Sequence, residues 1–209
     1  MAGASKPSRG RFITLEGVDG AGKSTHVPAI EALLRHRGLD VLVTREPGGT
    51  PLAESLRSLL LAEPMDPVTE TLLMFAARGD HVRRVLEPAL ASGRWVVCDR
   101  FTDATRAYQG AGKGVPAELI EQFAHSVHAG LAPDLTLVFD CPWAVASARL
   151  GRTGRALDRF EREDRDFFER VRAAYLALAR REPRRVRVLD ATRSLEIIKK
   201  QLEEEIATI

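Results

Sequence analysis

Short runs of consecutive apolar residues recur along the chain, and the segments between them carry apolar residues every three to four positions. The runs are rich in β-branched side chains and do not alternate with polar residues. Such continuous runs are typical of parallel strands that are covered on both faces. We therefore predict five strands, at residues 12–16, 41–44, 95–98, 135–140 and 186–190.

The intervening segments have the spacing of amphipathic helices, and they lie at 27–37, 51–62, 68–91, 116–129 and 167–181. Strands that alternate with helices predict an α/β fold, with a five-stranded parallel sheet and helices on both faces. No linker or internal repeat divides the chain. We predict one domain at residues 11–209, preceded by a disordered leader at residues 1–10.

Composition narrows the classes of protein that fit. The 209 residues include 31 Lys+Arg and 29 Asp+Glu, a balance that does not favour a nucleic-acid-binding protein. No apolar run approaches the roughly 18 to 20 residues that cross a bilayer, so no membrane span is expected. The N-terminus lacks the apolar segment of a secretion signal. Cys98 and Cys141 form no metal-binding or redox motif, and we expect two reduced thiols in a cytoplasmic protein.

The first predicted strand leads directly into a glycine-rich loop of the form G-x-x-x-x-G-K-[ST], followed by a helix. In this context the loop is a phosphate-binding loop, because backbone N–H groups and the helix N-terminus point at a polyphosphate. Lys23 is expected on the β- and γ-phosphates of ATP, and Ser24 on Mg²⁺. The predicted ATP phosphate site is Gly17, Val18, Asp19, Gly20, Ala21, Gly22, Lys23, Ser24 and Thr25.

Other features separate the classes of protein that use such loops. The chain contains no asparagine, which excludes the N-K-x-D element that reads guanine in GTPases. The chain is short for an oligomeric motor ATPase, and it contains no second nucleotide-binding module. A second glycine cluster, at 110–114, follows no strand, and we expect it to be a surface loop. A small phosphoryl-transfer enzyme remains, with a donor cradle and an acceptor pocket.

Three further clusters are candidates for the acceptor pocket. A turn rich in Gly and Pro, Thr-Arg-Glu-Pro-Gly-Gly-Thr, follows the second predicted strand at 44–50. Asp99 and Arg100 follow the third predicted strand, where ligands bind in open α/β sheets. Asp99 can reach a Mg²⁺ ion and Arg100 can grip a monophosphate, although the two could also form a purely structural pair. The third cluster, at 73–78, places an aromatic residue and an arginine on one helix.

Together with Thr-Asp-Ala-Thr-Arg-Ala-Tyr-Gln-Gly at 102–110, these segments resemble the motifs of bacterial thymidylate kinases, in the same order. The resemblance implies the P-loop nucleoside-monophosphate-kinase fold and transfer of the ATP γ-phosphoryl group to dTMP, giving dTDP for dTTP synthesis. By the same resemblance, Asp19 and Lys23 are catalytic, with Asp19 orienting the acceptor. The implied dTMP site is Asp19, Pro47, Met74, Phe75, Arg78, Arg100, Thr105, Tyr108 and Gln109.

Within that implied site, each residue has a role. Arg100 holds the phosphate, Arg78 donates to thymine O4, and Thr105 lies at the polar edge of the base. Tyr108 crowds the sugar 2′ position. Phe75 stacks on the base, but many relatives place the aromatic residue one position earlier, where this chain has Met74. Either side chain could therefore meet the base, and either could be part of the helix core.

A segment rich in arginine and glycine, at about 149–160, resembles the mobile lid of nucleotide kinases. Some relatives place an arginine after the acidic residue of the phosphate loop, where this chain has Gly20. The lid must then supply the catalytic charge, and Arg155 is the first candidate and Arg152 the second, with Arg149 at the base of the lid. The mixed-charge stretch 159–172 is expected to be a solvated face.

The family resemblance also implies a homodimer that pairs through the helices predicted at 68–91 and 116–129. Two alternatives remain open at this point. The chain could be another nucleoside-monophosphate or deoxynucleoside kinase of the same fold. It could also be a P-loop protein that hydrolyses ATP only to switch between partners.

Overall fold

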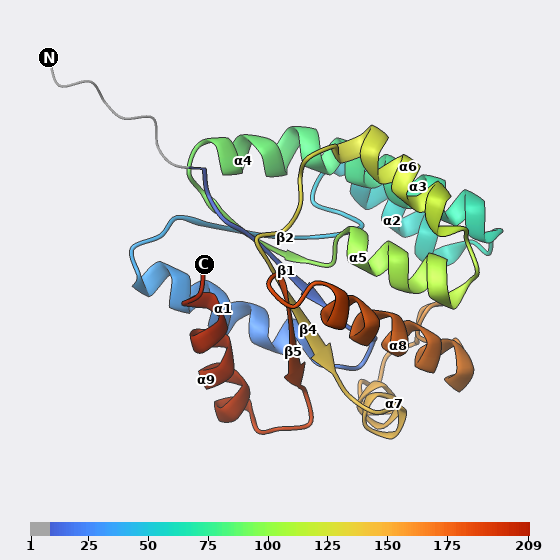
Figure 1. Cartoon of the computed structure of the whole chain (residues 1–209). Coiled ribbons are helices and arrows are strands. Elements are labelled where there is room, and N and C mark those ends of the chain that lie inside the picture. The colour runs from blue at the N-terminus through green and yellow to red at the C-terminus, as the bar shows by residue number, and fades with distance from the viewer. Residues whose placement is uncertain (1–8) are drawn as a thin grey trace, which may run out of the picture.

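Five parallel β-strands form one sheet in the computed structural model, which describes residues 9–209. The strand order is β2-β3-β1-β4-β5, so the first strand lies at the centre (Figure 1). β1 is buried along its whole length, including the polar side chains of Thr14 and Glu16. The strands are β1 (Phe12–Glu16), β2 (Val41–Arg45), β3 (Trp95–Asp99), β4 (Leu135–Asp140) and β5 (Val186–Asp190), and the five strand predictions are confirmed.

The register brings the carboxyl ends of β1 and β3 together. Leu15 pairs with Asp99, and the N–H of Arg100 donates to the carbonyl oxygen of Leu15 at 2.9 Å. The loop that follows β1 therefore lies beside the turn that follows β3. Parallel strands place their carboxyl-end loops at one edge of a sheet, and ligands bind there in folds of this kind.

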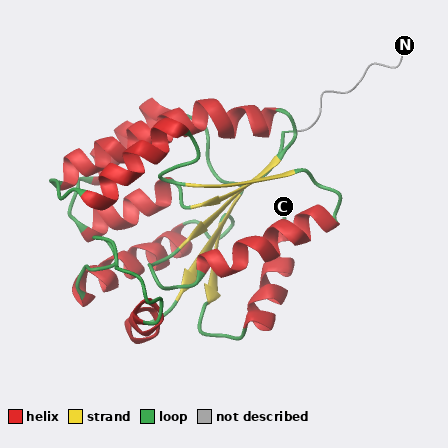
Figure 2. Ribbon diagram, turned by 180° about the vertical axis from the view of Figure 1, so that it is seen from behind, coloured by secondary structure: helices red, strands yellow, loops and turns green. Residues whose placement is uncertain are grey.

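Helices cover both faces of the sheet (Figures 1 and 2). α1 and α9 pack on one face, α4, α5 and α8 lie on the other, and α2, α3 and α6 form an outer group beyond that second face. The helices are α1 (Lys23–His36), α2 (Pro51–Ala62), α3 (Pro67–His81), α4 (Glu87–Ala91), α5 (Thr102–Thr105), α6 (Ala117–His128), α7 (Trp143–Gly151), α8 (Arg165–Arg181) and α9 (Leu195–Ile206).

The helix predicted at 68–91 is one helical run with an inserted π-helical segment, Val82–Leu86, between α3 and α4. The helix predicted at 27–37 begins four residues earlier, because the phosphate loop passes directly into α1. α5, α7 and α9 were missing from the predicted helices. For α9 a local signal exists, because Ser194 accepts a hydrogen bond from the N–H of Ile197, as an N-cap residue does.

The second glycine cluster is not the surface loop that the sequence suggests. Part of it belongs to a π-helical segment, Arg106–Gly112, that packs against α8. Gly112 is buried, and a Cβ atom at this position would lie 2.5 Å from Cε2 of Phe167. The glycine is required by close packing of two helical segments, which sequence spacing does not reveal.

The predicted leader needs a similar correction at its end. Residues 1–8 lie outside the described part of the chain, but Arg9 and Gly10 are part of the fold. Arg9 contacts the carboxylate of Asp134, and the N–H of Gly10 donates to the carbonyl oxygen of Leu90 at 2.9 Å. Within residues 9–209, no helix has the length and apolar character needed to span a bilayer.

Candidate active site

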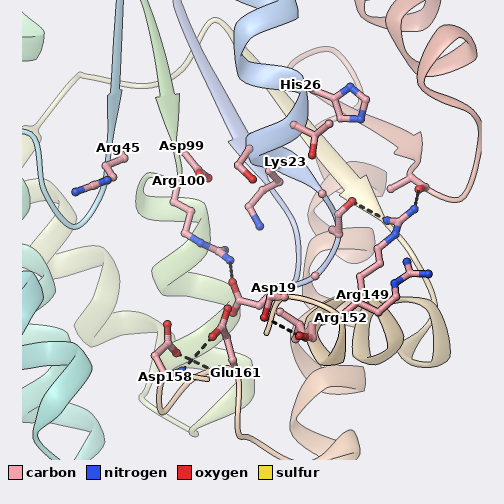
Figure 3. Close-up of a pocket in the computed structure, with 18 of the residues that line it drawn as sticks. Asp19, Lys23, His26, Arg45, Asp99, Arg100, Arg149, Arg152, Asp158 and Glu161 are labelled. Carbon is pink, nitrogen blue, oxygen red and sulfur yellow. Dashed lines mark hydrogen bonds and ion pairs between the residues drawn. The ribbon is translucent and has the colours of Figure 1, made fainter. Parts of the chain in front are cut away.

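A cavity of about 800 Å³ opens at the carboxyl edge of the sheet. Its walls come from the phosphate loop, the ends of β2 and β3, and the predicted lid (Figure 3). Arg100 lies on one side of Lys23, and Arg149 and Arg152 lie on the other. The predicted ATP phosphate residues Asp19 to Thr25 all line this cavity, whereas Gly17 and Val18 are buried beneath it.

The phosphate loop folds closely against the elements behind it. Gly17 has a φ of 128°, and a Cβ atom there would lie 2.3 Å from the carbonyl oxygen of Phe139. Only glycine tolerates both the conformation and the contact. Lys23 is nearly buried, and its ammonium group donates to the carbonyl oxygens of Gly17 and Val18 at 3.1 and 3.0 Å. Burial lowers the pKa of Lys23 and the nearby Arg100 lowers it further. The ammonium group thus lies at the mouth of the loop.

Arg100 joins the phosphate loop to the turn after β3. Its backbone has a φ of 71°, which is rare for a residue other than glycine. Its guanidinium donates to Oδ1 of Asp19 at 2.6 Å, to the carbonyl oxygen of Gly17 at 2.9 Å and to the hydroxyl of Tyr108 at 2.9 Å. The Tyr108 hydroxyl donates in turn to Oδ2 of Asp19 at 2.8 Å. Burial raises the pKa of Asp19, but the adjacent Arg100 and Lys23 hold it below its ordinary value overall.

Glu16 supports this arrangement from beneath. Its Oε1 accepts the N–H of Phe101 at 2.8 Å, and its Oε2 accepts the hydroxyl hydrogen of Tyr175 at 2.7 Å. Tyr175 also accepts a hydrogen bond from Arg100 at 3.3 Å. Burial and then the charge of Asp103 raise the pKa of Glu16 from 4.5 to about 7, against the opposing effect of Arg100. Glu16 therefore fixes the peptide group that follows Arg100, and it also fixes the Tyr175 hydroxyl that accepts a hydrogen bond from the Arg100 guanidinium.

The residues predicted to bind the metal lie in the same cavity. Asp99 and Ser24 both line it. Oδ1 of Asp99 is buried, and no atom among residues 9–209 donates a hydrogen bond to it. A carboxylate and a hydroxyl oxygen are the ligand types that Mg²⁺ prefers, and Mg²⁺ in kinases takes few protein ligands because it keeps water molecules and phosphate oxygens. The donor set fits a magnesium ion that is bound together with a nucleotide.

A second cavity of about 90 Å³ adjoins the first. Asp19 and Arg100 line both cavities, so they stand at the junction. Of the predicted dTMP-binding residues, eight line the second cavity: Asp19, Pro47, Met74, Arg78, Arg100, Thr105, Tyr108 and Gln109.

Phe75 is the exception, and its predicted contact with the base needs correction. It is 2% exposed, packs against Phe123 of α6 and is absent from the cavity wall. Successive residues on a helix point about 100° apart, so Met74 faces the cavity while Phe75 faces the core. Phe75 contacts the site only through Arg78, whose guanidinium carbon lies 4.7 Å from the ring centre. Of the two candidates for contact with the base, Met74 lines the cavity and Phe75 does not.

The polar end of the second cavity contains an incompletely bonded guanidinium. Nε of Arg78 donates to Oε2 of Glu46 at 2.7 Å, and Nη2 donates to Oγ1 of Thr105 at 3.2 Å. Nη1 is buried and finds no acceptor among the residues that the structure describes. Beside it, the amide nitrogen of Gln109 donates to Glu70 at 2.7 Å. Arg78 thus lines the cavity while one of its guanidinium nitrogens has no acceptor among residues 9–209.

The arginines of the predicted lid differ in their partners. Arg149 donates to the carbonyl oxygens of Ala21 and Ala191, at 3.1 and 2.8 Å, and so ties the segment to the phosphate loop. Arg152 and Arg155 line the large cavity and are exposed, with Arg155 paired to Glu161. Arg159 is not part of a solvated face as expected. Its guanidinium forms an ion pair with the fully buried carboxylate of Glu70. A buried negative charge is destabilising unless a positive group pairs with it.

Comparison with known proteins gives a consistent result. The thymidylate kinase family model matches residues 15–202. The chain belongs to the thymidylate kinase family. It is 60% identical to a thymidylate kinase of Bordetella pertussis over 198 residues, which cover 95% of both chains. It is 56% identical to one of Methylobacillus flagellatus over 194 residues, 93% of this chain and 95% of the relative.

A solved structure of thymidylate kinase from Ehrlichia chaffeensis shares 33% identity with the chain and has a TM-score of 0.76. The match covers 96% of this chain and 99% of the other. The resemblance seen in the sequence and the predicted P-loop kinase fold are both confirmed. The alternative of a P-loop switch protein has no support in these comparisons.

Several residues of this thymidylate kinase site were missed in the sequence. Glu16 gives a signal, because an acidic residue ends an otherwise apolar strand run. Glu46 lies inside a recognised motif, but only the fold shows that it pairs with Arg78. Tyr175 comes from α8, far away in the chain, and nothing in its local sequence distinguishes it from a core residue.

The raised pKa of Glu16 predicts a pH-dependent stability. Because the native state binds this proton more tightly than the unfolded chain, the free energy of unfolding should fall as pH rises from about 4.5 to about 7. A shift of this size corresponds to roughly 3 kcal/mol. Glu16→Gln mimics the protonated side chain and should remove most of that fall. The measurement is urea unfolding of both proteins from pH 5 to pH 8.

Glu118→Gln, at an exposed position on α6, is the matched control and should retain the wild-type pH dependence. Parallel stability curves for wild type and Glu16→Gln would contradict the assignment of the titration to Glu16.

Proposed function

We propose that the two adjoining cavities bind ATP and dTMP, and that the enzyme transfers the ATP γ-phosphoryl group to dTMP, giving dTDP and ADP for dTTP synthesis. The observation that carries this is the position of Asp19 and Arg100, which line both cavities. A donor phosphate in the phosphate loop and an acceptor phosphate at Arg100 then meet at one point. Phosphoryl transfer requires little more than such alignment and charge stabilisation.

On the donor side, the phosphate loop and the N-terminus of α1 hold the ATP phosphates. The ammonium of Lys23 moves from the carbonyl oxygens of Gly17 and Val18 to the β- and γ-phosphates. Ser24 and Asp99 hold Mg²⁺, and the bare Oδ1 of Asp99 supports this assignment. When bound, Mg²⁺ neutralises phosphate charge. Arg149 fixes the base of the lid beside the loop.

On the acceptor side, Arg100 holds the dTMP phosphate, and Asp19 orients it through the sugar. The Nη1 donor of Arg78 faces thymine O4, which would complete its hydrogen bonding. Thr105 and Gln109 lie at the polar edge of the base, Pro47 and Met74 contact its faces, and Tyr108 crowds the sugar 2′ position.

We also propose that the described residues, 9–209, act as a single domain in the cytoplasm, with 149–160 as the lid. Cys98 and Cys141 are buried free thiols, which suits a reducing compartment.

A homodimer is proposed through α2 and α3. Four exposed apolar side chains lie on these two helices, Leu52, Leu59, Val68 and Leu72. α6 belongs to the same outer group, but its solvent side carries mainly charged and polar residues. We expect sedimentation to show a dimer at micromolar concentration and Leu72→Glu to shift it to monomer. A wild-type monomer under these conditions would contradict the proposal.

The function predicts a clear acceptor preference. With Mg-ATP, dTMP should support ADP release better than dUMP, dCMP, dGMP or thymidine. Thymidine lacks the phosphate that Arg100 holds, dCMP and dGMP do not present the 4-keto pyrimidine edge to Arg78, and dUMP lacks the 5-methyl group that packs in the base cavity. The measurement is a coupled assay of ADP release across this panel. ADP release that does not depend on any nucleotide acceptor would overturn the proposal and favour a switch ATPase.

The lid should supply charge to the transition state. Gly20 lacks a side chain, so Arg155 is expected to leave Glu161 and reach the transferred group. We predict that Arg155→Ala lowers kcat by at least about a hundredfold, with a smaller change in the KM for dTMP. Arg162→Ala, in the mixed-charge stretch but outside the cavity wall, is the control. Wild-type kcat in single alanine variants of Arg149, Arg152 and Arg155 would show that the lid supplies no such charge.

A further inference from the structure

Two polar residues that follow Arg78 on α3 attach this helix to the turn at 44–50. Oγ1 of Thr50 donates to Oδ2 of Asp80 at 2.6 Å. Nε2 of His81 lies 2.8 Å from Oγ1 of Thr44. His81 is 0% exposed, so its ring makes all of its contacts inside the protein. The turn and the helix are thus joined by partly buried polar contacts next to the acceptor cavity.

The His81 ring is held in one orientation. Nδ1 lies 2.9 Å from Oε1 of Glu46, and because a carboxylate only accepts, Nδ1 carries the hydrogen and donates it. The ring also lies directly against Gly49, where a Cβ atom would come within 2.5 Å of Cδ2 and Nε2. Three residues of the turn therefore fix one imidazole ring, and the absence of a side chain at Gly49 makes room for it.

Glu46 connects the fixed His81 ring to Arg78 in the wall of the base cavity. One carboxylate oxygen accepts from His81 and the other accepts from Nε of Arg78 at 2.7 Å. Burial acts to raise the pKa of Glu46, but Arg78 and the His81 hydrogen bond hold it below its ordinary value, so the group is a carboxylate. With Nε and Nη2 engaged, only Nη1 of the Arg78 guanidinium lacks a partner among residues 9–209.

We propose that His81 is a positioning residue for recognition of the acceptor base, acting through Glu46 on Arg78. Without the Nδ1 hydrogen bond, the Glu46 carboxylate is free to rotate and the guanidinium loses its fixed tilt. A guanidinium N–H can donate to the 4-keto oxygen of thymine but leaves the 4-amino group of cytosine without a partner. The direction in which the guanidinium points therefore determines the selectivity between the two bases. This inference rests on the proposed base-reading role of Arg78.

The test compares kcat/KM for dTMP and dCMP in wild type, His81→Leu and His81→Asn. His81→Leu removes both hydrogen bonds and should lower the dTMP:dCMP ratio at least about fivefold, with a raised KM for dTMP and an unchanged KM for ATP. His81→Asn keeps an amide N–H near the position of Nδ1 and should recover part of the ratio. Thr44→Val, which removes only the Nε2 partner, provides a second folded test and should lower the ratio about twofold.

Val82→Ala is the control for destabilisation, because Val82 is the next residue along the chain and is buried in the core instead of contacting the turn. It should lower Tm and leave the ratio unchanged. A wild-type ratio in a folded His81 variant, or an equal loss of ratio in Val82→Ala, would overturn the inference. Arg78→Ala distinguishes failure of the His81 role from failure of the base-reading role of Arg78. If Arg78→Ala also retains the wild-type dTMP:dCMP ratio, the base-reading role of Arg78 is refuted. If Arg78→Ala loses the ratio and the His81 variants retain it, only the role of His81 is refuted.

Discussion

The Arg100 guanidinium is the centre on which the site depends, because it is a positive charge held among buried oxygen atoms at the carboxyl edge of β1 and β3. Its partners come from the phosphate loop, from the segment after α5 and from α8. The Arg100 backbone has a left-handed conformation, and Glu16 holds the next peptide group in place. An arginine fixed in this way loses little side-chain entropy when a phosphate arrives.

Asp19 gives that charge a second use. Its carboxylate forms an ion pair with Arg100, and the positive charge of Lys23 also lowers its pKa. A dTMP phosphate that binds Arg100 must share the guanidinium with Asp19, which leaves the carboxylate to interact with the sugar. In the proposed function, the same pair would align the acceptor and keep it next to the phosphate loop. The family relationship gives the overall reaction, and this junction explains how the geometry performs it.

Much of the fold follows from the sequence because the forces that shape it are local. Continuous apolar runs identify the five strands, and the strand-loop-helix context identifies the phosphate loop without any tertiary information. The candidate acceptor residues were assigned from ordered motifs that resemble those of the family, and their roles stay predictions. The helix predictions were less complete. α5, α7 and α9 were missing, and the π-helical segment Arg106–Gly112 packs against α8, which is distant in the chain.

The remaining parts of the site depend on tertiary contacts. Whether Met74 or Phe75 lines the second cavity is decided by the rotation of α3 against α6, which a 3.6-residue spacing leaves open. The partial burial of Arg159 depends on Glu70, a carboxylate whose other partners, Gln109 and Lys113, come from a segment far from Arg159 in the chain. Glu16, Glu46 and Tyr175 act by holding other residues, and their partners lie far away in the chain.

The most direct test of the Arg100 junction is calorimetric titration with dTMP and with thymidine, which differ only in the phosphate group. Thymidine binding reports an intact base cavity in each protein. We predict that wild type binds dTMP at least about a hundredfold more tightly than thymidine, and that Arg100→Ala reduces this ratio below about tenfold while thymidine affinity is retained. An Arg100→Ala variant that keeps the wild-type ratio would contradict the account.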